Sequence, residues 1–143
     1  MAAAALALAL AAVPISDPIQ IGPKTYDSPI SLYQGRHYVP KDNDERLCIR
    51  QRESRHDYRA VSSTGKYRGA YQFSPELGVG AAWMIQRELK RQGVEDAEAI
   101  GEDLRSHPVN QWAPVFQDMA FWLVWNDGKG ARHWDVPGER CGL

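Results

Sequence analysis

The residues best placed to do chemistry lie between Cys48 and Glu76. One glutamate, Glu53, stands among arginines in "CIRQRESRHDYRA", and "KYRGAYQFSPE" follows about a dozen residues later. A carboxyl group can protonate the leaving oxygen of a glycosidic bond if apolar surroundings raise its pKa. Nearby arginines act in the opposite direction, because a cation lowers the pKa of a carboxyl group. Glu53 is therefore either one charge on a solvated helix or a catalytic acid.

Other chemistries have no matching pattern in the sequence. The four histidines show no metal-ligand spacing, and we find neither a G-x-S-x-G nucleophile elbow nor a phosphate-binding glycine loop. The net charge of −1 gives no electrostatic footprint for nucleic acid or for an anionic membrane surface. We therefore expect no metal, no cofactor and no nucleic-acid partner. The histidines are His37, His56, His107 and His133.

A helix that begins near Asp42 is expected to position Glu53. Asp42 and the glutamate three residues later form a capping-box pattern. Ile49 and Glu53 are four residues apart and share a helix face, which places Glu53 near the C-terminal end of this helix. The 100° step between helical residues turns Arg50 and Arg52 away from that face, so we expect them to point outward.

The rest of the domain is predicted to be mostly helical. Glycines and aromatics in "SSTGKYRGAYQFS" predict a short hairpin or an extended loop. Capping and breaker residues then predict helices over 75–92, 96–104 and 112–125, the last with a proline in its first turn. The expected class is α+β, mostly helical, with one short irregular β element. Three tryptophans are expected in the core: Trp83, Trp112 and Trp122.

The N-terminal part divides into two segments. The apolar run within residues 1–13 is too short to span a bilayer and suits the core of a signal peptide, although no Lys or Arg follows Met1. A start-site artefact or a buried hydrophobic helix is the alternative. Residues 14–41 contain five prolines and predict an extended linker. Residues 42–143 would form one domain, expected to be an exported monomer without a stable membrane span.

The two cysteines, Cys48 and Cys141, bracket this domain. In an exported domain they favour a disulfide, and closing a loop of about 93 residues is worth about 4–5 kcal/mol in the loop-entropy model. A reactive thiol at Cys48 is the alternative, but no histidine stands beside it and no nucleophile motif surrounds it.

"RESRHDYRAVSSTGKYRGAYQFS" resembles the catalytic core of the lysozyme-like lytic transglycosylases, above all the transglycosylase-like domain of the actinobacterial resuscitation-promoting factors. The resemblance extends from Leu47 to Cys141, and residues 78–107 form a longer insertion than compact members have. The matching positions are the catalytic pair Glu53-Ser54, the aromatic Tyr58, the loop Thr64-Gly65, the segment Gly69-Ala70-Tyr71-Gln72-Phe73, the turn Trp125-Asn126 and the closing Trp134 and Cys141.

The resemblance implies a small lysozyme-like fold that cleaves β-1,4 bonds between N-acetylmuramic acid and N-acetylglucosamine in peptidoglycan. Members use one glutamate as acid and then as base, and leave 1,6-anhydro ends. That residue would be Glu53, so Asp57 is not required as a second acid. A secreted, cell-wall-associated enzyme acting on peptidoglycan glycan strands is expected; a hydrolytic muramidase and a non-catalytic wall-binding module are the alternatives. The implied substrate-binding residues are Tyr58, Thr64, Tyr67, Tyr71, Gln72, Trp125 and Asn126.

Overall fold

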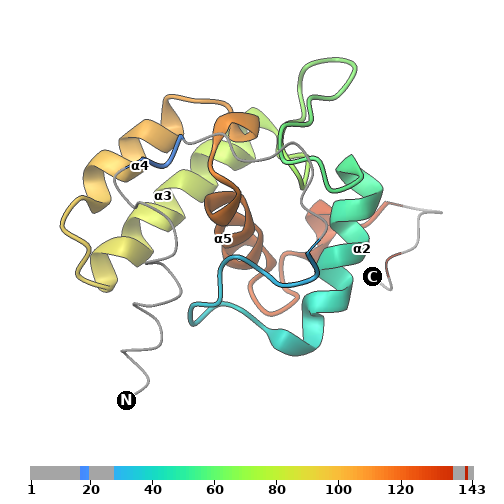
Figure 1. The fold of residues 1–143 in the computed structure, drawn as a ribbon, viewed down its shortest axis with the longest axis horizontal. Helices are drawn as coiled ribbons and strands as arrows, with labels where there is room; N and C mark the ends of the chain where they lie inside the picture. The colour runs from blue at the N-terminus through green and yellow to red at the C-terminus, as the bar shows by residue number, and fades with distance from the viewer. Residues whose placement is uncertain (1–16, 20–27, 137–140, 142–143) are drawn as a thin grey trace.

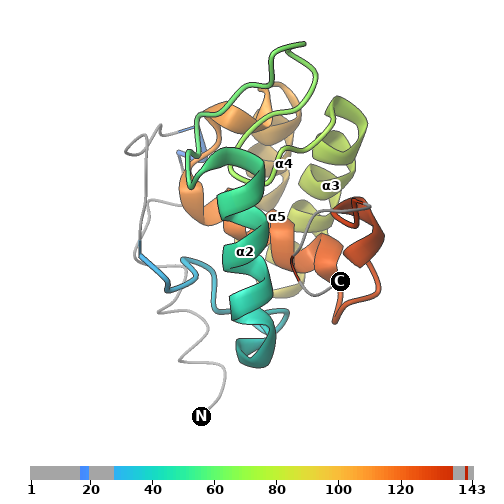
Figure 2. The ribbon, with the colours of Figure 1, turned by 90° about the vertical axis from the view of Figure 1, so that its right-hand side faces the viewer.

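The computed structural model describes residues 17–19, 28–136 and 141. The α-helices of this part are α2 (Asn43–Ser54), α3 (Pro75–Arg91), α4 (Ala97–Arg105) and α5 (Pro114–Trp125). Short 3-10 turns lie at Pro40–Asp42, Val109–Gln111 and Ala131–His133. Helix α5 occupies the middle, with α3 and α4 on one side and α2 on the other (Figure 1 and Figure 2). The prediction of a mostly helical chain is confirmed.

Helix α5 is central because it has almost no polar face. Every residue from Val115 to Trp125 is buried. A helix that is apolar on all sides needs neighbours on all sides. Pro114 lies in its first turn, as expected, but the helix starts there and not at residue 112, and Asn126 ends it in the left-handed conformation with φ 47°. The polar exceptions inside α5, Gln117 and Asp118, are therefore forced into the core.

Helices α3 and α4 pack on each other by their apolar faces. Ser74 caps α3 by accepting a hydrogen bond from the backbone N–H of Leu77. The expectation that Trp83 lies in the core is wrong, because its position on α3 faces away from the buried side and 44% of it is exposed. The guanidinium carbon of Arg105 on α4 lies 3.6 Å from the centre of the Trp83 ring.

The segment between α2 and α3 forms very little β structure. Two isolated antiparallel bridges join Arg68 to Val61 and to Phe73, and no sheet forms within the described residues. Of the two alternatives predicted here, a short hairpin or an extended loop, the structure has a loop with single bridges. The backbone is nevertheless ordered by hydrogen bonds across it, such as those in both directions between Arg68 and Phe73.

Residues 28–41 pack against the domain, which corrects their prediction as an extended spacer. Tyr33 is fully buried, and the indole N–H of Trp122 donates to the hydroxyl of Ser31 at 3.0 Å. The backbone N–H of Leu32 donates to Asp118 on α5 at 2.9 Å. The packed unit therefore starts before the boundary expected near residue 42. The signal-like residues 1–13 lie outside the described residues.

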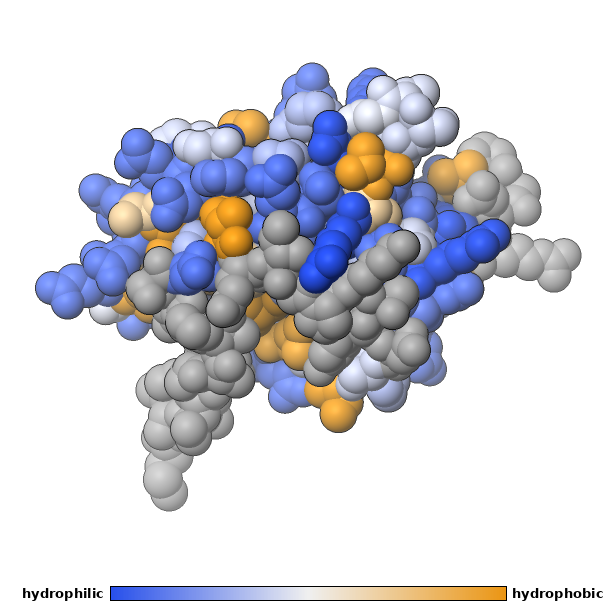
Figure 3. All heavy atoms as spheres, turned by 45° about the horizontal axis from the view of Figure 1, so that its top comes forward, coloured by the Kyte–Doolittle hydropathy of each residue, from blue (hydrophilic) through white to orange (hydrophobic). Residues whose placement is uncertain are grey.

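The predicted disulfide between Cys48 and Cys141 is confirmed, with a Cα–Cα distance of 5.5 Å. It ties α2 to the C-terminal end of the chain across 93 residues. No helix in the described ranges is long and apolar enough to cross a membrane. Where the face drawn in Figure 3 is coloured, it is mostly hydrophilic, with small separate hydrophobic spots.

Candidate functional site

Glu53 lies in the last complete turn of α2, as the sequence predicts. Its side chain is 23% exposed, and its Oε1 accepts a hydrogen bond from Nη2 of Arg52 at 3.0 Å. The same Nη2 also donates to the backbone carbonyl of Trp134. Glu53 can therefore be reached from solvent, but in this state it is engaged by a guanidinium that is also tied to the C-terminal segment.

Helix α2 ends sharply just after Glu53. Arg55 and His56 both have left-handed backbone conformations, with φ 54° and 64°. The N–H of Arg55 donates to the carbonyl of Gln51 and that of His56 to the carbonyl of Arg50, which closes the last turn. Two consecutive non-glycine residues in this region are strained, and strain of this kind is concentrated at functional sites.

Asp57, the other carboxylate considered near Glu53, is used in the turn that follows α2. Its Oδ1 accepts a hydrogen bond from the backbone N–H of Arg59 at 2.9 Å. Its own N–H donates to the hydroxyl of Ser54 at 3.1 Å. These bonds are those of a local turn, so the structure does not pair Asp57 with Glu53.

The inner side of α2 carries two fully buried arginines, Arg46 and Arg50. The expectation that Arg50 points outward is therefore wrong. Its guanidinium donates to Nδ1 of His56 at 2.7 Å, to the hydroxyl of Tyr58 at 3.0 Å and to the carbonyl of Ser28 at 3.0 Å. A buried cation is tolerated only when its donors are satisfied in this way.

Asp118 is the acceptor at the centre of this buried network. Its Oδ1 accepts from the hydroxyls of Tyr58 and Tyr71, each at 2.6 Å, and lies 3.7 Å from Nη1 of Arg46. Burial raises the pKa of both tyrosines, and the negative charge of Asp118 raises it further. The network joins α5 to α2 and to the loop after it, and so holds the helix that carries Glu53.

Three of the predicted substrate-binding residues are buried, which contradicts direct contact of their side chains with a substrate. Tyr58 and Tyr71 are each 2% exposed, and Trp125 is 4% exposed. The Trp125 ring stacks on Phe121 at 5.5 Å, and its indole N–H donates to Asp42 at 2.9 Å. Asp42 makes no side-chain cap bond at the start of α2, so the predicted capping box is not formed.

The other predicted substrate-binding residues are accessible. Thr64 and Asn126 are exposed, and Tyr67 is 41% exposed with the Lys66 ammonium 5.3 Å from its ring centre. Gln72 is partly buried, has a left-handed backbone with φ 53°, and donates from Nε2 to the carbonyl of Gly69 at 3.0 Å. Thr64, Tyr67 and Gln72 share the loop after α2, whereas Asn126 follows α5.

The glycine of "GAYQF" has a packing reason that sequence reasoning missed. Gly69 has φ 83°, and a Cβ there would lie 2.5 Å from Oε1 of Gln117 on α5. The same oxygen accepts from the backbone N–H of Ala70 at 2.8 Å, while Nε2 of Gln117 donates to the carbonyl of Tyr58 at 2.9 Å. The Gln117 side chain thus binds the loop at both Tyr58 and Ala70. Two polar residues within the apolar sequence of α5 were the feature from which such a buried contact could have been predicted.

Two pockets formed by described residues are lined by side chains other than Glu53. One, of about 250 Å³, lies between the loop after α2 and the segment that links α4 to α5, and neither Glu53 nor another acidic side chain is among its described lining residues. The second, of about 300 Å³, surrounds Glu88 on α3 together with Arg36 and Arg91. Within the described part of the chain, no group of three or more His, Cys, Asp or Glu residues is arranged to hold a metal ion.

No protein-family profile matches this chain, and no curated protein and no solved structure matches it either. The candidate site is therefore defined by the residues of this chain alone.

Proposed function

We propose that this chain cleaves β-1,4 glycosidic bonds of peptidoglycan, with Glu53 as the catalytic acid and base. The observation that carries the proposal is the setting of Glu53: a partly exposed carboxylate at the end of a helix held in place on its inner side. Catalysis requires such a group to be held rigidly while its reactive atoms stay accessible. Glu53 is part of the "RES" segment, and both this segment and the later "GAYQF" segment resemble lytic transglycosylases.

The proposed reaction needs only one carboxyl group. Protonated Glu53 gives its proton to the glycosidic oxygen while the bond from that oxygen to C1 of the muramic acid breaks. The resulting carboxylate takes the proton of the muramic acid 6-hydroxyl. At the same time the oxygen of that hydroxyl bonds to C1 and closes a 1,6-anhydro ring. Arg52 must release Glu53 before the first step, and its bond to the Trp134 carbonyl offers it an alternative partner.

A lysozyme-like fold and an extracytoplasmic location are part of the same proposal. The order of a helix ending at the acid, an irregular loop with β bridges and a further helix supports the fold. The disulfide supports the location, because such bonds persist in oxidising compartments.

A second candidate function is a wall-binding module without catalysis. The ion pair between Arg52 and Glu53 at 3.0 Å favours it, because the guanidinium occupies the carboxylate oxygen that a catalytic acid would have to present to the substrate. Exposed residues of the loop, such as Tyr67, would then serve glycan binding alone.

The test is turbidity clearing of purified cell walls by the wild type, Glu53→Gln and the control Glu102→Gln. Glu102 is an exposed carboxylate on α4, so its loss should leave clearing unchanged. Glu53→Gln should reduce clearing by about 100-fold or more, because it removes general acid catalysis. Mass spectrometry of the products then shows anhydro ends for a transglycosylase and reducing ends for a hydrolytic muramidase.

Full clearing by Glu53→Gln would show that the acid assignment is wrong. If neither the wild type nor the variant clears walls, but both are retained on insoluble peptidoglycan, the binding module is the better description.

A further inference from the structure

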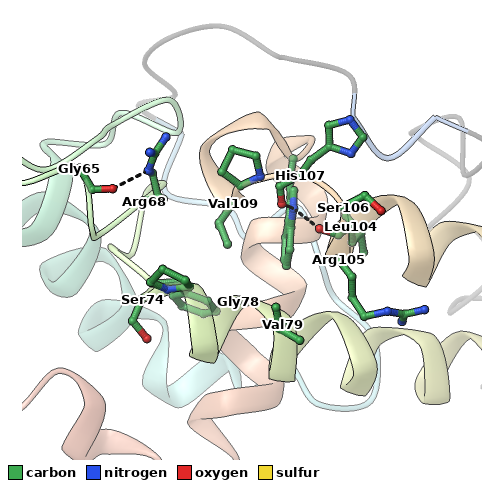
Figure 4. Close-up of a pocket in the computed structure, with 14 residues that line it drawn as sticks. Gly65, Arg68, Ser74, Gly78, Val79, Leu104, Arg105, Ser106, His107 and Val109 are labelled. Atoms are coloured by element: carbon green, nitrogen blue, oxygen red, sulfur yellow. Dashed lines mark hydrogen bonds between the residues drawn. The ribbon is translucent and has the colours of Figure 1, made fainter.

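The two pockets described above differ in how their arginines are used. At the pocket of about 250 Å³, Arg105 turns its guanidinium away from the interior (Figure 4), stacks on Trp83 and donates to Gln86 at 2.7 Å. At the pocket of about 300 Å³, two arginines instead gather around the carboxylate of Glu88. The second pocket is therefore the better candidate for binding a charged ligand.

The 300 Å³ pocket is built mainly on one side of α3. Four of its lining residues stand three and four positions apart on this helix and so share one face of it. These are Met84, Arg87, Glu88 and Arg91; Arg36 and His37 join them from the segment before α2. None of them belongs to α2 or to the loop after it, so the pocket is separate from the candidate site at Glu53.

The charges that line this pocket do not balance, although the whole chain has a net charge of only −1. Glu88 is the one acidic residue among the described lining residues, against Arg36, Arg87 and Arg91. Burial would raise the pKa of Glu88, but hydrogen bonds from Arg91 and Arg36 outweigh it and hold that pKa far below its usual range, so the carboxylate stays ionised. With His37 neutral, the lining keeps an excess of two positive charges.

The three arginines also keep hydrogen-bond donors that the described chain does not use. Nε and Nη2 of Arg36 donate to the Glu88 carboxylate at 3.0–3.2 Å, and the same two nitrogens of Arg91 donate to it at 2.6–3.2 Å. A guanidinium has five N–H donors, and the Nη1 group of each of these arginines binds no other described residue. Arg87 is exposed and makes no ion pair or hydrogen bond within the described ranges.

We propose that this pocket binds a phosphate monoester group. The inference is independent of the cleavage reaction proposed above. A phosphate monoester carries a charge of about −1.5 to −2 at pH 7, which matches the excess of two positive charges in the lining. Its terminal oxygens accept hydrogen bonds that the planar fork of a guanidinium supplies in pairs. Met84 and Leu123, which also line the pocket, provide apolar contact for a short organic chain attached to the phosphate.

A soluble ester suits the pocket better than a lipid headgroup does. Membrane surfaces bind proteins through apolar side chains that enter the bilayer, in addition to electrostatic attraction. None of the exposed large hydrophobic residues in the described part of the chain lines this pocket. The charges of the pocket therefore stand without the apolar contact that a membrane surface requires.

The experiment is a titration of the isotope-labelled full chain with glycerol 3-phosphate, in which NMR follows the backbone amide shifts. Succinate, a dianion without a phosphate group, and neutral glycerol are the comparison probes. Arg36→Gln, Arg87→Gln and Arg91→Gln are each titrated in the same way. Arg132→Gln is the matched control, because Arg132 is an exposed arginine that does not line this pocket.

We expect glycerol 3-phosphate to cause saturable shifts around Glu88, and to bind more tightly than succinate and glycerol. Each pocket variant should weaken this binding by about fivefold or more, the effect of losing one charge-assisted hydrogen bond. Arg132→Gln should leave the affinity unchanged. Arg87→Gln is the most informative variant, because Arg87 binds no other described residue and its loss should leave the thermal melt unchanged.

Wild-type affinity of Arg87→Gln for glycerol 3-phosphate, or equal affinity of the wild type for succinate, would overturn the inference. Co-sedimentation with phosphatidylcholine vesicles that contain phosphatidic acid tests the other source of the phosphate group. Vesicle binding that the three pocket variants abolish, without any response to glycerol 3-phosphate, would overturn the assignment to a soluble ester. None of these outcomes depends on wall clearing, so the pocket and the proposed catalytic role can fail separately.

Discussion

Asp118 and Glu88 are both buried carboxylates, on α5 and α3, but they are stabilised by opposite kinds of partner. Asp118 accepts short hydrogen bonds from the hydroxyls of Tyr58 and Tyr71. Its ion-pair partner, Arg46, is as fully buried as Asp118 itself. The side chains that bind Asp118 are therefore shielded from water, and a substitution of Asp118 leaves them buried without their partner.

Glu88 is held instead from the surface. It binds Arg36 and Arg91, whose side chains are 50% and 44% exposed. Burial alone would raise the pKa of Glu88, but hydrogen bonds from Arg91, Arg36, Gln92 and His37 outweigh it and hold that pKa far below its usual range. Water and salt can reach these partners, so their contribution is screened.

The two carboxylates therefore connect different parts of the protein. The Asp118 network joins α5, residues 28–41, α2 and the loop that follows α2, and thus supports the helix that carries Glu53. The Glu88 cluster joins α3 to Arg36 and His37, away from the lining of the 250 Å³ pocket. A substitution of Asp118 should therefore disturb the candidate site, whereas a substitution of Glu88 should affect only the residues around it.

The largest expected effect is the difference in the free energy of unfolding between the variants Asp118→Asn and Glu88→Gln. Removing the charge of Asp118 leaves Arg46 buried without its carboxylate, which should lower the free energy of unfolding by about 3–5 kcal/mol. Glu88→Gln should cost about 1–2 kcal/mol, because its partners can turn to water. Urea denaturation measures both, and equal losses would contradict the comparison.

The next largest effect is the difference in stability between substitutions of two tyrosines in the same loop, Tyr71 and Tyr67. Tyr71→Phe removes a hydroxyl that donates to Asp118 and accepts from Arg46, so it should cost about 1–3 kcal/mol. Tyr67→Phe alters an exposed ring and should change stability by about 0.5 kcal/mol or less. Thermal melts of the two variants against the wild type test this; a larger loss at Tyr67 would place the loop's anchor elsewhere.

At alkaline pH the protein should lose stability as the buried tyrosines, among them the two that bind Asp118, ionise on unfolding. Folding raises the pKa of Tyr58 and Tyr71, and burial raises the pKa of Tyr33 to about 12. A group whose pKa is raised in the folded state contributes its stability below the unfolded pKa, here about 10, and loses it as pH rises further. Tyrosinate absorbance during unfolding from pH 9 to 12 measures this, and Tyr71→Phe should flatten the loss of stability.

At acid pH the Glu88 cluster should contribute the smallest of these effects. Its pKa is lowered in the folded state, so its stabilisation is present above the unfolded pKa of about 4.3 and is lost as pH falls below it. Glu88→Gln should therefore reduce the slope of stability against pH between about 5 and 3. An unchanged slope would mean that solvent screens the cluster completely.

Local rules predicted the helices well. The boundaries of α3 and α5 depend on a serine cap, prolines in the first turn and residues that end a helix, all of which act over a few residues. The position of Glu53 at the end of α2 followed from the same spacing. The disulfide was predicted because only two cysteines exist to pair.

Burial of polar residues was not predictable by these rules. Helical periodicity treats Arg46 and Arg50 as polar and places them outside, but both are fully buried. Their partners lie far along the chain: Tyr71 is 25 residues from Arg46, and Ser28 is 22 residues from Arg50. Likewise Trp83, apolar by type, is exposed because α3 turns it away from α5.

The sequence by itself determined the helices, the pairing of Cys48 with Cys141 and the place of Glu53 at a helix end, because these depend on neighbours in the chain or on a unique pair. Only the tertiary structure decided which side chains of the candidate site are accessible. It buried Tyr58, Tyr71 and Trp125 and left Tyr67 exposed. The physical reason is that a buried polar group needs partners in fixed positions, and these partners meet only when distant segments pack together.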